Sequence, residues 1–134
     1  MIYLLDTSIC ILYFNGRSAN VLNRIDNTDF KDIVLCSVVK AELIVGAIKS
    51  PQPEKNFAVY RSFTAHFTSL PFDDRAADVY GNIRADLEKR GTPIGPNDLM
   101  IAAIALAHNL VLVTNNTREF GRVTGLRIED WHTP

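Results

Sequence analysis

The chain has 134 residues, of which 47% are hydrophobic and 22% charged, and its formal net charge at pH 7 is −1. This length and composition are typical of a globular domain that buries roughly two-thirds of its unfolded surface, so we expect a single domain over residues 1–134. The near-zero charge neither indicates nor excludes a nucleic-acid partner, because a local basic rim can lie on a neutral body.

The first half of the chain alternates short apolar runs with segments of helical spacing. The apolar runs predict strands, and the segments with apolar residues three and four apart predict helices. In chain order we expect a strand at 2–5, helices at 7–14 and 19–27, a strand at 33–36, and helices at 37–49 and 54–67. Thr7 or Ser8, and then Ser37, are expected to cap the helices that they begin.

The second half continues this alternation. We expect a strand at 70–72, a helix at 73–90 that Gly91 ends, a helix at 97–108, and strands at 110–113 and 126–128. Trp131 is expected to close over the core. Short buried strands that alternate with helices predict an α/β fold, with a parallel sheet covered by helices on both faces. In that fold class, ligands bind outside the carboxyl ends of the strands.

Neither the start of the chain nor its most apolar stretch predicts a signal peptide or a membrane segment. The start, MIYLLDTS, has no basic segment and meets Asp6 at once. The most apolar stretch, 99–113, is broken by two polar residues and is shorter than the ~20 residues that a membrane span needs. Cys10 and Cys36 lie in apolar runs, which favours buried free thiols over a disulfide and fits a reducing cytoplasm.

Three acidic residues stand where the predicted fold would gather them. Asp6 directly follows the first expected strand, Asp98 begins a largely apolar helix, and Glu42 lies early in the helix after the second strand. Each has an ordinary explanation alone, as a loop acid, a partner of the helix dipole or an exposed helix residue. Together at one sheet edge they would repel unless a cation were bound. Oxygen ligands favour Mg²⁺ or Mn²⁺ over zinc.

The segment VLVTNNTREF, at 111–120, ends an apolar strand in a polar tip. A turn is the ordinary interpretation, because Asn caps its own backbone. A parallel sheet would nevertheless place this tip at the same edge as Asp6. Thr114 and Asn116 are therefore further candidates for the same site.

Four blocks of the sequence resemble the PIN-domain ribonucleases, and among them most closely the VapC toxins of bacterial toxin–antitoxin pairs. The blocks are MIYLLDTS, SVVKAELIVGA, GTPIGPNDLMIAAIA and LVLVTNNTREFGRVTGLRIEDW, and they cover essentially the whole chain. The resemblance implies a PIN-like three-layer sandwich and an endoribonuclease that uses Mg²⁺ or Mn²⁺ to cut single-stranded or loop RNA, with a transfer RNA anticodon loop as one substrate. It also implies a VapB-like antitoxin as partner and a toxin homodimer.

The resemblance assigns roles to the acids. Asp6 and Asp98 match the best metal-ligand positions of the family, and Glu42 matches its third acid, which would orient the attacking water or bind a second ion. Thr7, Ser8 and Thr114 would support them by hydrogen bonding.

The chain departs from the family pattern at two positions. Many relatives have Asn where this chain has Ser8, and a fourth acid where it has Asn116. An Asn oxygen can bind a metal but adds no charge, and Glu119 could restore that charge. Asn116 and Glu119 are therefore further candidate ligands.

Five basic residues flank these segments: Arg84, Lys89, Arg90, Arg118 and Arg122. They either bind the phosphates of RNA or solvate the surface, and the sequence favours neither.

Two other functions stay open. A phosphatase of the haloacid-dehalogenase type would use Asp6 as nucleophile, but such enzymes usually have a second Asp where this chain has Ser8. A PIN-like module that binds RNA or protein without catalysis is favoured by the neutral Asn116. It is opposed by the three intact acids.

Overall fold

Five parallel strands form one sheet in the order β3-β2-β1-β4-β5 in the computed structural model, which describes all residues from 1 to 134. The strands are β1 (Tyr3–Leu5), β2 (Ile33–Cys36), β3 (Thr68–Leu70), β4 (Val111–Val113) and β5 (Arg127–Glu129). Both faces of a parallel sheet are covered, so its inner strands are continuous apolar runs. Every residue of β2 and β4 is accordingly buried.

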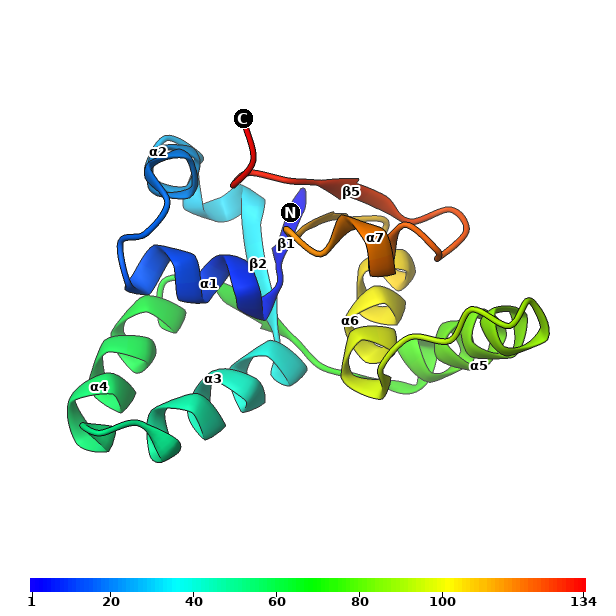
Figure 1. Cartoon of the computed structure of the whole chain (residues 1–134), viewed down its shortest axis with the longest axis horizontal. Helices are drawn as coiled ribbons and strands as arrows, with labels where there is room; N and C mark the ends of the chain where they lie inside the picture. The colour runs from blue at the N-terminus through cyan, green and yellow to red at the C-terminus, as the bar shows by residue number, and fades with distance from the viewer.

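Helices cover the two faces of the sheet. They are α1 (Thr7–Phe14), α2 (Ala19–Asp26), α3 (Ser37–Lys49), α4 (Pro53–Thr64), α5 (Asp74–Lys89), α6 (Pro96–Ala107) and α7 (Thr117–Phe120), with a 3-10 turn, η1 (Phe30–Asp32). Right-handed crossovers put the helices between β1 and β3 on one face and those between β3 and β5 on the other. Figure 1 shows α1–α4 and α5–α7 on opposite sides of the central strands. The predicted three-layer α/β sandwich is confirmed.

The chain reverses its direction along the sheet between β1 and β4, which are neighbours. The connection after β1 leads toward β2, whereas the connection after β4 leads toward β5. At such a switch point the carboxyl ends of the strands open into a crevice. Leu5 pairs with Val113, and the N–H of Asp6 donates to the carbonyl of Val113 at 3.0 Å. Asp6 and Thr114 therefore lie side by side at this crevice.

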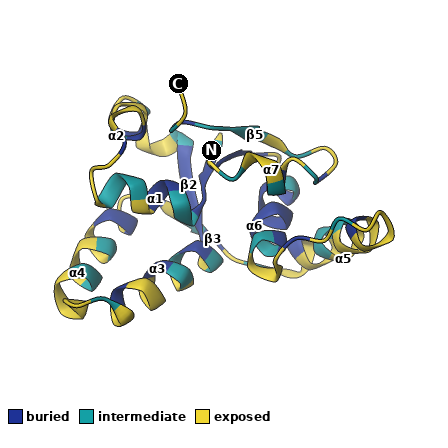
Figure 2. Cartoon of the chain, viewed as in Figure 1, coloured by how far each residue is buried: buried dark blue, intermediate teal, exposed yellow.

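Small residues let α6 approach the sheet closely. Ala102, Ala103 and Ala105 are fully buried, as are Leu4 and Leu112 in the strands. In Figure 2 the buried residues gather on the central strands and α6, whereas α5 and the outer part of α4 are largely exposed. Close packing of α6 against the sheet holds the first turn of this helix at a fixed position relative to β1.

Several predicted boundaries and caps were wrong. The third strand is Thr68–Leu70 rather than 70–72, because Thr68 already pairs with Val34. The helix expected to reach 67 ends at Thr64. Neither Thr7 nor Ser8 caps α1: Asp6 does, since its Oδ1 accepts from the N–H of Ile9 at 3.0 Å.

Other differences concern helix starts. Ser37 lies inside the first turn of α3, whose capping position is Cys36. The helix expected at 97 begins one residue earlier, at Pro96. Neither α7 nor η1 was predicted, because elements of four and three residues are too short to show a hydrophobic period.

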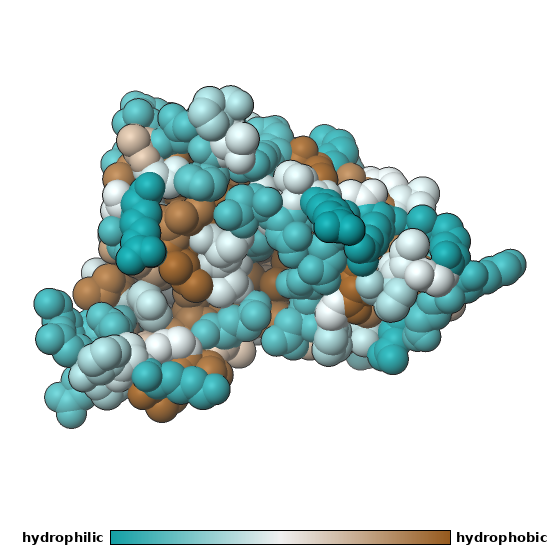
Figure 3. Space-filling view, viewed as in Figure 1, coloured by the Kyte–Doolittle hydropathy of each residue, from teal (hydrophilic) through white to brown (hydrophobic).

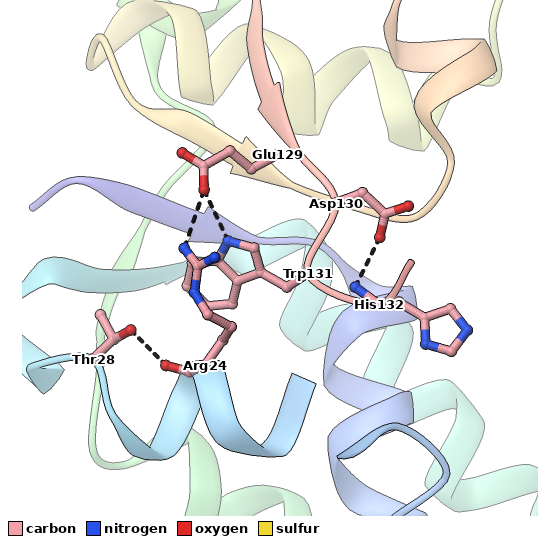
Figure 4. Close-up of polar contacts among 6 residues, drawn as sticks. All are labelled: Arg24, Thr28, Glu129, Asp130, Trp131 and His132. Carbon is pink, nitrogen blue, oxygen red and sulfur yellow. Dashed lines mark hydrogen bonds and ion pairs between the residues drawn. The ribbon is translucent and has the colours of Figure 1, made fainter. Parts of the chain in front are cut away.

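Trp131 closes over the core, as predicted, and ties the C-terminal segment to β1 and α2 (Figure 4). Its ring centroid lies 5.0 Å from that of Tyr3 in an edge arrangement, and its indole N–H donates to Glu129 at 3.0 Å. The Arg24 guanidinium lies 4.5 Å from the Trp131 centroid and pairs with Glu129 at 3.2 Å. The indole thus stacks against the Arg24 guanidinium and donates to the same carboxylate that pairs with it.

Cys10 and Cys36 are buried free thiols, as predicted. Burial raises the pKa of both, that of Cys36 to about 11, so neither is a reactive thiolate at neutral pH. None of the helices combines the length and the apolar character that crossing a membrane requires.

Two glycines of the α5 region test this account of the helices. Gly91 follows α5 with φ of +72°, whereas Gly81 lies within α5, and a Cβ built there would have no heavy atom within 4 Å. We predict that Gly91→Ala destabilises the protein by about 1–2 kcal/mol, because an L side chain is strained there. Gly81→Ala is expected to stabilise it by about 0.5–1 kcal/mol. Urea unfolding measures both, and effects of the same sign would contradict the prediction.

Candidate active site

A pocket of about 260 Å³ opens at the carboxyl ends of β1 and β4. Its lining consists of Asp6, Thr7, Ser8, Ile11, Glu42, Asp98, Ile101, Asn116 and Phe120. The structure therefore brings together the three acids that the sequence singled out, although 36 and 56 positions separate them along the chain (42 − 6 and 98 − 42). No Lys, Arg or His belongs to the lining.

Asp6 is the most buried of these acids, with 4% of its surface exposed. Its Oδ1 accepts from the Ser8 hydroxyl at 2.7 Å and from the N–H of Ile9 at 3.0 Å. Burial raises the pKa of Asp6, and hydrogen bonds from Thr114, Ser8 and Ile9 oppose that rise. One carboxylate oxygen is thus fixed by the first turn of α1, which orients the whole group.

Glu42 reaches the pocket from α3 and is half-buried. The Thr7 hydroxyl donates to its Oε1 at 2.7 Å. Thr7 is the first residue of α1, so this single contact sets the position of Glu42 relative to Asp6 across two helices.

Asp98 lies in the first turn of α6, at the third helical position after the capping residue Gly95. Its pKa is raised to about 7, by burial first and then by Glu119, with smaller contributions from Glu42 and Asp6. In the absence of a cation, burial and the neighbouring carboxylates therefore favour the protonated form of Asp98. When it holds a proton, it shares a hydrogen bond with Glu119.

Asn116 and Glu119 face each other at the tip after β4. Asn116 Nδ2 donates to Glu119 Oε2 at 2.9 Å, and the N–H of Gly95 donates to Glu119 Oε1 at 3.0 Å. Desolvation raises the pKa of Glu119, but hydrogen bonds from Gly95, Asn116 and Asp98, together with the charge of Arg122, lower it overall. Thr114 Oγ1 accepts from the N–H of Asn116 at 2.9 Å, which shapes the tip.

The acids do not form a preassembled ligand cluster, since no three of the His, Cys, Asp and Glu side chains converge closely enough. They line the pocket from different walls instead.

Three of the five basic residues that the sequence offered as candidates for RNA binding contact other groups of this chain. Arg84 contacts Glu88 at 2.8 Å within α5, and Arg90, which directly follows α5, contacts Asp86 of that helix at 2.8 Å. Arg122 Nη1 donates to the carbonyl of Pro93 at 3.0 Å. Lys89 and Arg118 are exposed.

Sequence analysis missed three apolar residues that line the pocket: Ile11, Ile101 and Phe120. No signal could have found them, because apolar residues beside a site have the same pattern as core residues. The two carboxylates paired with Arg84 and Arg90 could have been found, since both pairs have the i,i+4 spacing of helix neighbours.

The chain and its fold match those of a known protein family. The PIN domain family matches residues 3–126. The tRNA(fMet)-specific endonucleases VapC of Shigella flexneri and Salmonella typhimurium are 46% and 43% identical to the chain over 129 residues, which is 96% of this chain and 97% of each relative. A crystal structure of DNA-bound VapBC from Salmonella typhimurium superposes with a TM-score of 0.92 at 42% identity and covers 98% of both chains. The chain belongs to the PIN-domain family, within its VapC ribonucleases.

Proposed function

We propose that this chain is the toxin of a toxin–antitoxin pair and hydrolyses phosphodiester bonds of RNA with a divalent cation held by Asp6 and Asp98. The observation that carries the proposal is the convergence of Asp6, Glu42 and Asp98 on one pocket with no cationic side chain in its lining. Uncompensated carboxylates in a partly buried site are costly, and a bound cation removes that cost.

The donors in the pocket fit Mg²⁺ or Mn²⁺. Every polar side chain of the lining offers an oxygen atom as a possible metal ligand, from a carboxylate, a hydroxyl or an amide group. No thiol or imidazole is present to favour zinc. Mg²⁺ typically keeps several waters and uses one or two carboxylates, so a preassembled cluster of three is not needed. We assign Asp6 and Asp98 as ligands, with Glu42 either orienting the attacking water or binding a second ion. The predicted ligand roles of Asn116 and Glu119 stay predictions.

The residues of the chain prepare the reaction. Ser8 and Ile9 fix one oxygen of Asp6, Thr114 donates a further hydrogen bond to its carboxylate, and Thr7 holds Glu42 toward the pocket. When bound, a divalent cation activates water as a nucleophile and neutralises the charge that develops on the phosphate. Glu42, oriented by Thr7, is placed to accept a hydrogen bond from the attacking water. Attack of this water on the phosphorus with the 3′ oxygen as leaving group would give 5′-phosphate and 3′-hydroxyl ends, which the resemblance to PIN-domain ribonucleases implies.

We infer a transfer RNA as the substrate. Two relatives of 43% and 46% identity are named tRNA(fMet)-specific endonucleases, which supports the initiator transfer RNA, cut in a single-stranded loop. Since Arg84, Arg90 and Arg122 contact other parts of the protein, Lys89 and Arg118 are the residues best placed to bind phosphate.

We infer a VapB-like antitoxin as the partner. Several of the structures that this chain resembles are VapBC complexes. The chain also exposes apolar side chains, among them Ile44, Val45 and Ile48 on α3 and Ile11 on α1. In Figure 3 the most extensive hydrophobic areas lie on the half of the molecule that carries α1, α3 and α4. Neighbouring exposed apolar residues are typical of protein interfaces. A homodimer and a cytoplasmic site of action stay predictions.

Two rival functions are weighed against this proposal. Membership of the PIN family rules out the phosphatase of the haloacid-dehalogenase type. A module that has lost catalysis is opposed by the presence of Asp6, Glu42 and Asp98 in a single pocket.

Replacing Asp6 tests the metal-dependent reaction. We predict that Asp6→Asn lowers the rate of RNA cleavage by at least about 100-fold, because the substitution removes a ligand charge. Asn caps helices as well as Asp, so the fold is retained. The assay uses initiator transfer RNA, Mg²⁺ or Mn²⁺, and protein freed of antitoxin. Asp78→Asn, on the exposed face of α5, is the matched control and should cleave normally. Undiminished cleavage by Asp6→Asn, or by the wild type in EDTA, would refute the proposal.

The raised pKa of Asp98 predicts a pH dependence of metal binding. A protonated Asp98 cannot act as a ligand, so a proton and the cation compete for it. Apparent Mn²⁺ affinity should fall as the pH drops below about 7, by up to about tenfold per pH unit, and should level off above it. Isothermal titration calorimetry measures this dependence. His66→Gln, in the aromatic cluster with Phe30 and outside the lining of the pocket, is the control variant and should retain the pH dependence. Affinity independent of pH would contradict the assignment.

A further inference from the structure

The helix that carries Asp98 begins without a hydrogen bond from the side chain of its capping residue. Gly95 occupies the capping position of α6 and has no side chain, so it cannot cap the helix itself. Pro96, Asn97 and Asp98 follow as the first three helical residues. In a capping box, the acid at the third position reaches back to the N–H of the capping residue. Asp98 holds that third position, yet its carboxyl group lines the pocket instead.

Glu119 accepts this N–H instead. Its Oε1 lies 3.0 Å from the N of Gly95, although the two residues are 24 positions apart. Its Oε2 accepts from Asn116 at 2.9 Å, so each of its oxygens has a fixed donor. Glu119 thereby supplies from α7 the hydrogen bond that a capping box would take from Asp98.

Two arginines brace the same contact. Arg122, three residues after Glu119, donates to the carbonyl of Pro93 at 3.0 Å. Arg90 donates to the carbonyl of Arg122 at 2.6 Å and to Asp86 at 2.8 Å. The segment from Glu119 to Arg122 is therefore joined both to the loop before α6 and to the end of α5. This brace explains why these two arginines lie where they do without any bound RNA.

We propose that Glu119 is a positioning residue for RNA cleavage: it takes over the capping of α6 from Asp98 and thereby leaves Asp98 directed into the pocket beside Asp6. The inference rests on the proposed function in one respect, that Asp98 acts in catalysis. It differs from the prediction that Glu119 is a metal ligand, because it requires a hydrogen-bond acceptor at this position and not a negative charge.

Two variants separate acceptor from charge. Glu119→Ala removes the acceptor, whereas Glu119→Gln keeps an amide oxygen for Gly95, and the Asn116 amide can turn over to accept from the new NH₂ group. We expect Glu119→Ala to speed hydrogen exchange at the Gly95 amide and to lower kcat by about 10- to 100-fold, with KM for RNA changed less than about threefold. Glu119→Gln should restore slow exchange, and kcat to within about threefold of wild type. Glu54→Ala, an exposed acid of α4, is the matched control.

The outcomes that overturn the proposal are distinct. If Glu119→Gln is as inactive as Glu119→Ala and binds Mn²⁺ at least about tenfold more weakly than wild type, the carboxylate charge is required and Glu119 is a ligand. If Glu119→Ala leaves exchange at Gly95 unchanged, the capping role is wrong, whatever the activity. Since the exchange measurement needs neither metal nor RNA, this result is independent of whether the proposed ribonuclease activity is correct.

Discussion

The pairing of β1 with β4 sets the geometry of the whole site. These neighbours are the strands from which the chain departs in opposite directions, so no crossover helix covers the space beyond their carboxyl ends. The bond from the Asp6 N–H to the Val113 carbonyl continues the ladder one residue past β1 and places Asp6 beside the tip at Thr114. Helices that follow strands begin at this same edge, which brings in Glu42 from α3. Asp98 lies on α6, and the buried alanines of this helix pack it against the sheet.

The same convergence creates the chemistry. Burial raises the pKa of Asp98, and carboxylates that are far apart in sequence come close enough to raise it further. The fold tolerates this charge because donors satisfy three of the four acids separately: the N–H of Ile9 in α1 donates to Asp6, Thr7 donates to Glu42, and Gly95 and Asn116 donate to Glu119. Such preorganised but electrostatically unfavourable sites are typical of metal-dependent catalysis, where a cation supplies the missing charge.

Sequence reasoning could predict the strands and the three main acids, because strand ends and helix starts in a parallel α/β fold have known places. Asp6 and Glu42 needed only this rule and the hydrophobic pattern. The sequence alone could not predict α7, because four residues are too few to show a hydrophobic period. Nor could it predict the contact between Glu119 and Gly95, since a hydrogen bond across 24 residues leaves no local pattern. The cap of α1 was assigned to hydroxyl residues, although Asp is an equally good cap and stands one position earlier. The sequence leaves Arg122 a candidate for RNA binding. Its acceptor in the structure is the backbone carbonyl of Pro93, which cannot be recognised from the spacing of side chains.

The central claim is that a divalent cation binds between Asp6 and Asp98 at the carboxyl ends of β1 and β4. Anomalous diffraction from crystals of the antitoxin-free protein grown with Mn²⁺ tests it most directly. The account predicts a manganese peak within bonding distance, about 2.0–2.3 Å, of one oxygen from each of these carboxylates, completed by waters, and absent from Asp6→Asn crystals. A strong peak elsewhere on the protein with none in this pocket, or a peak that persists unchanged in Asp6→Asn, would contradict it.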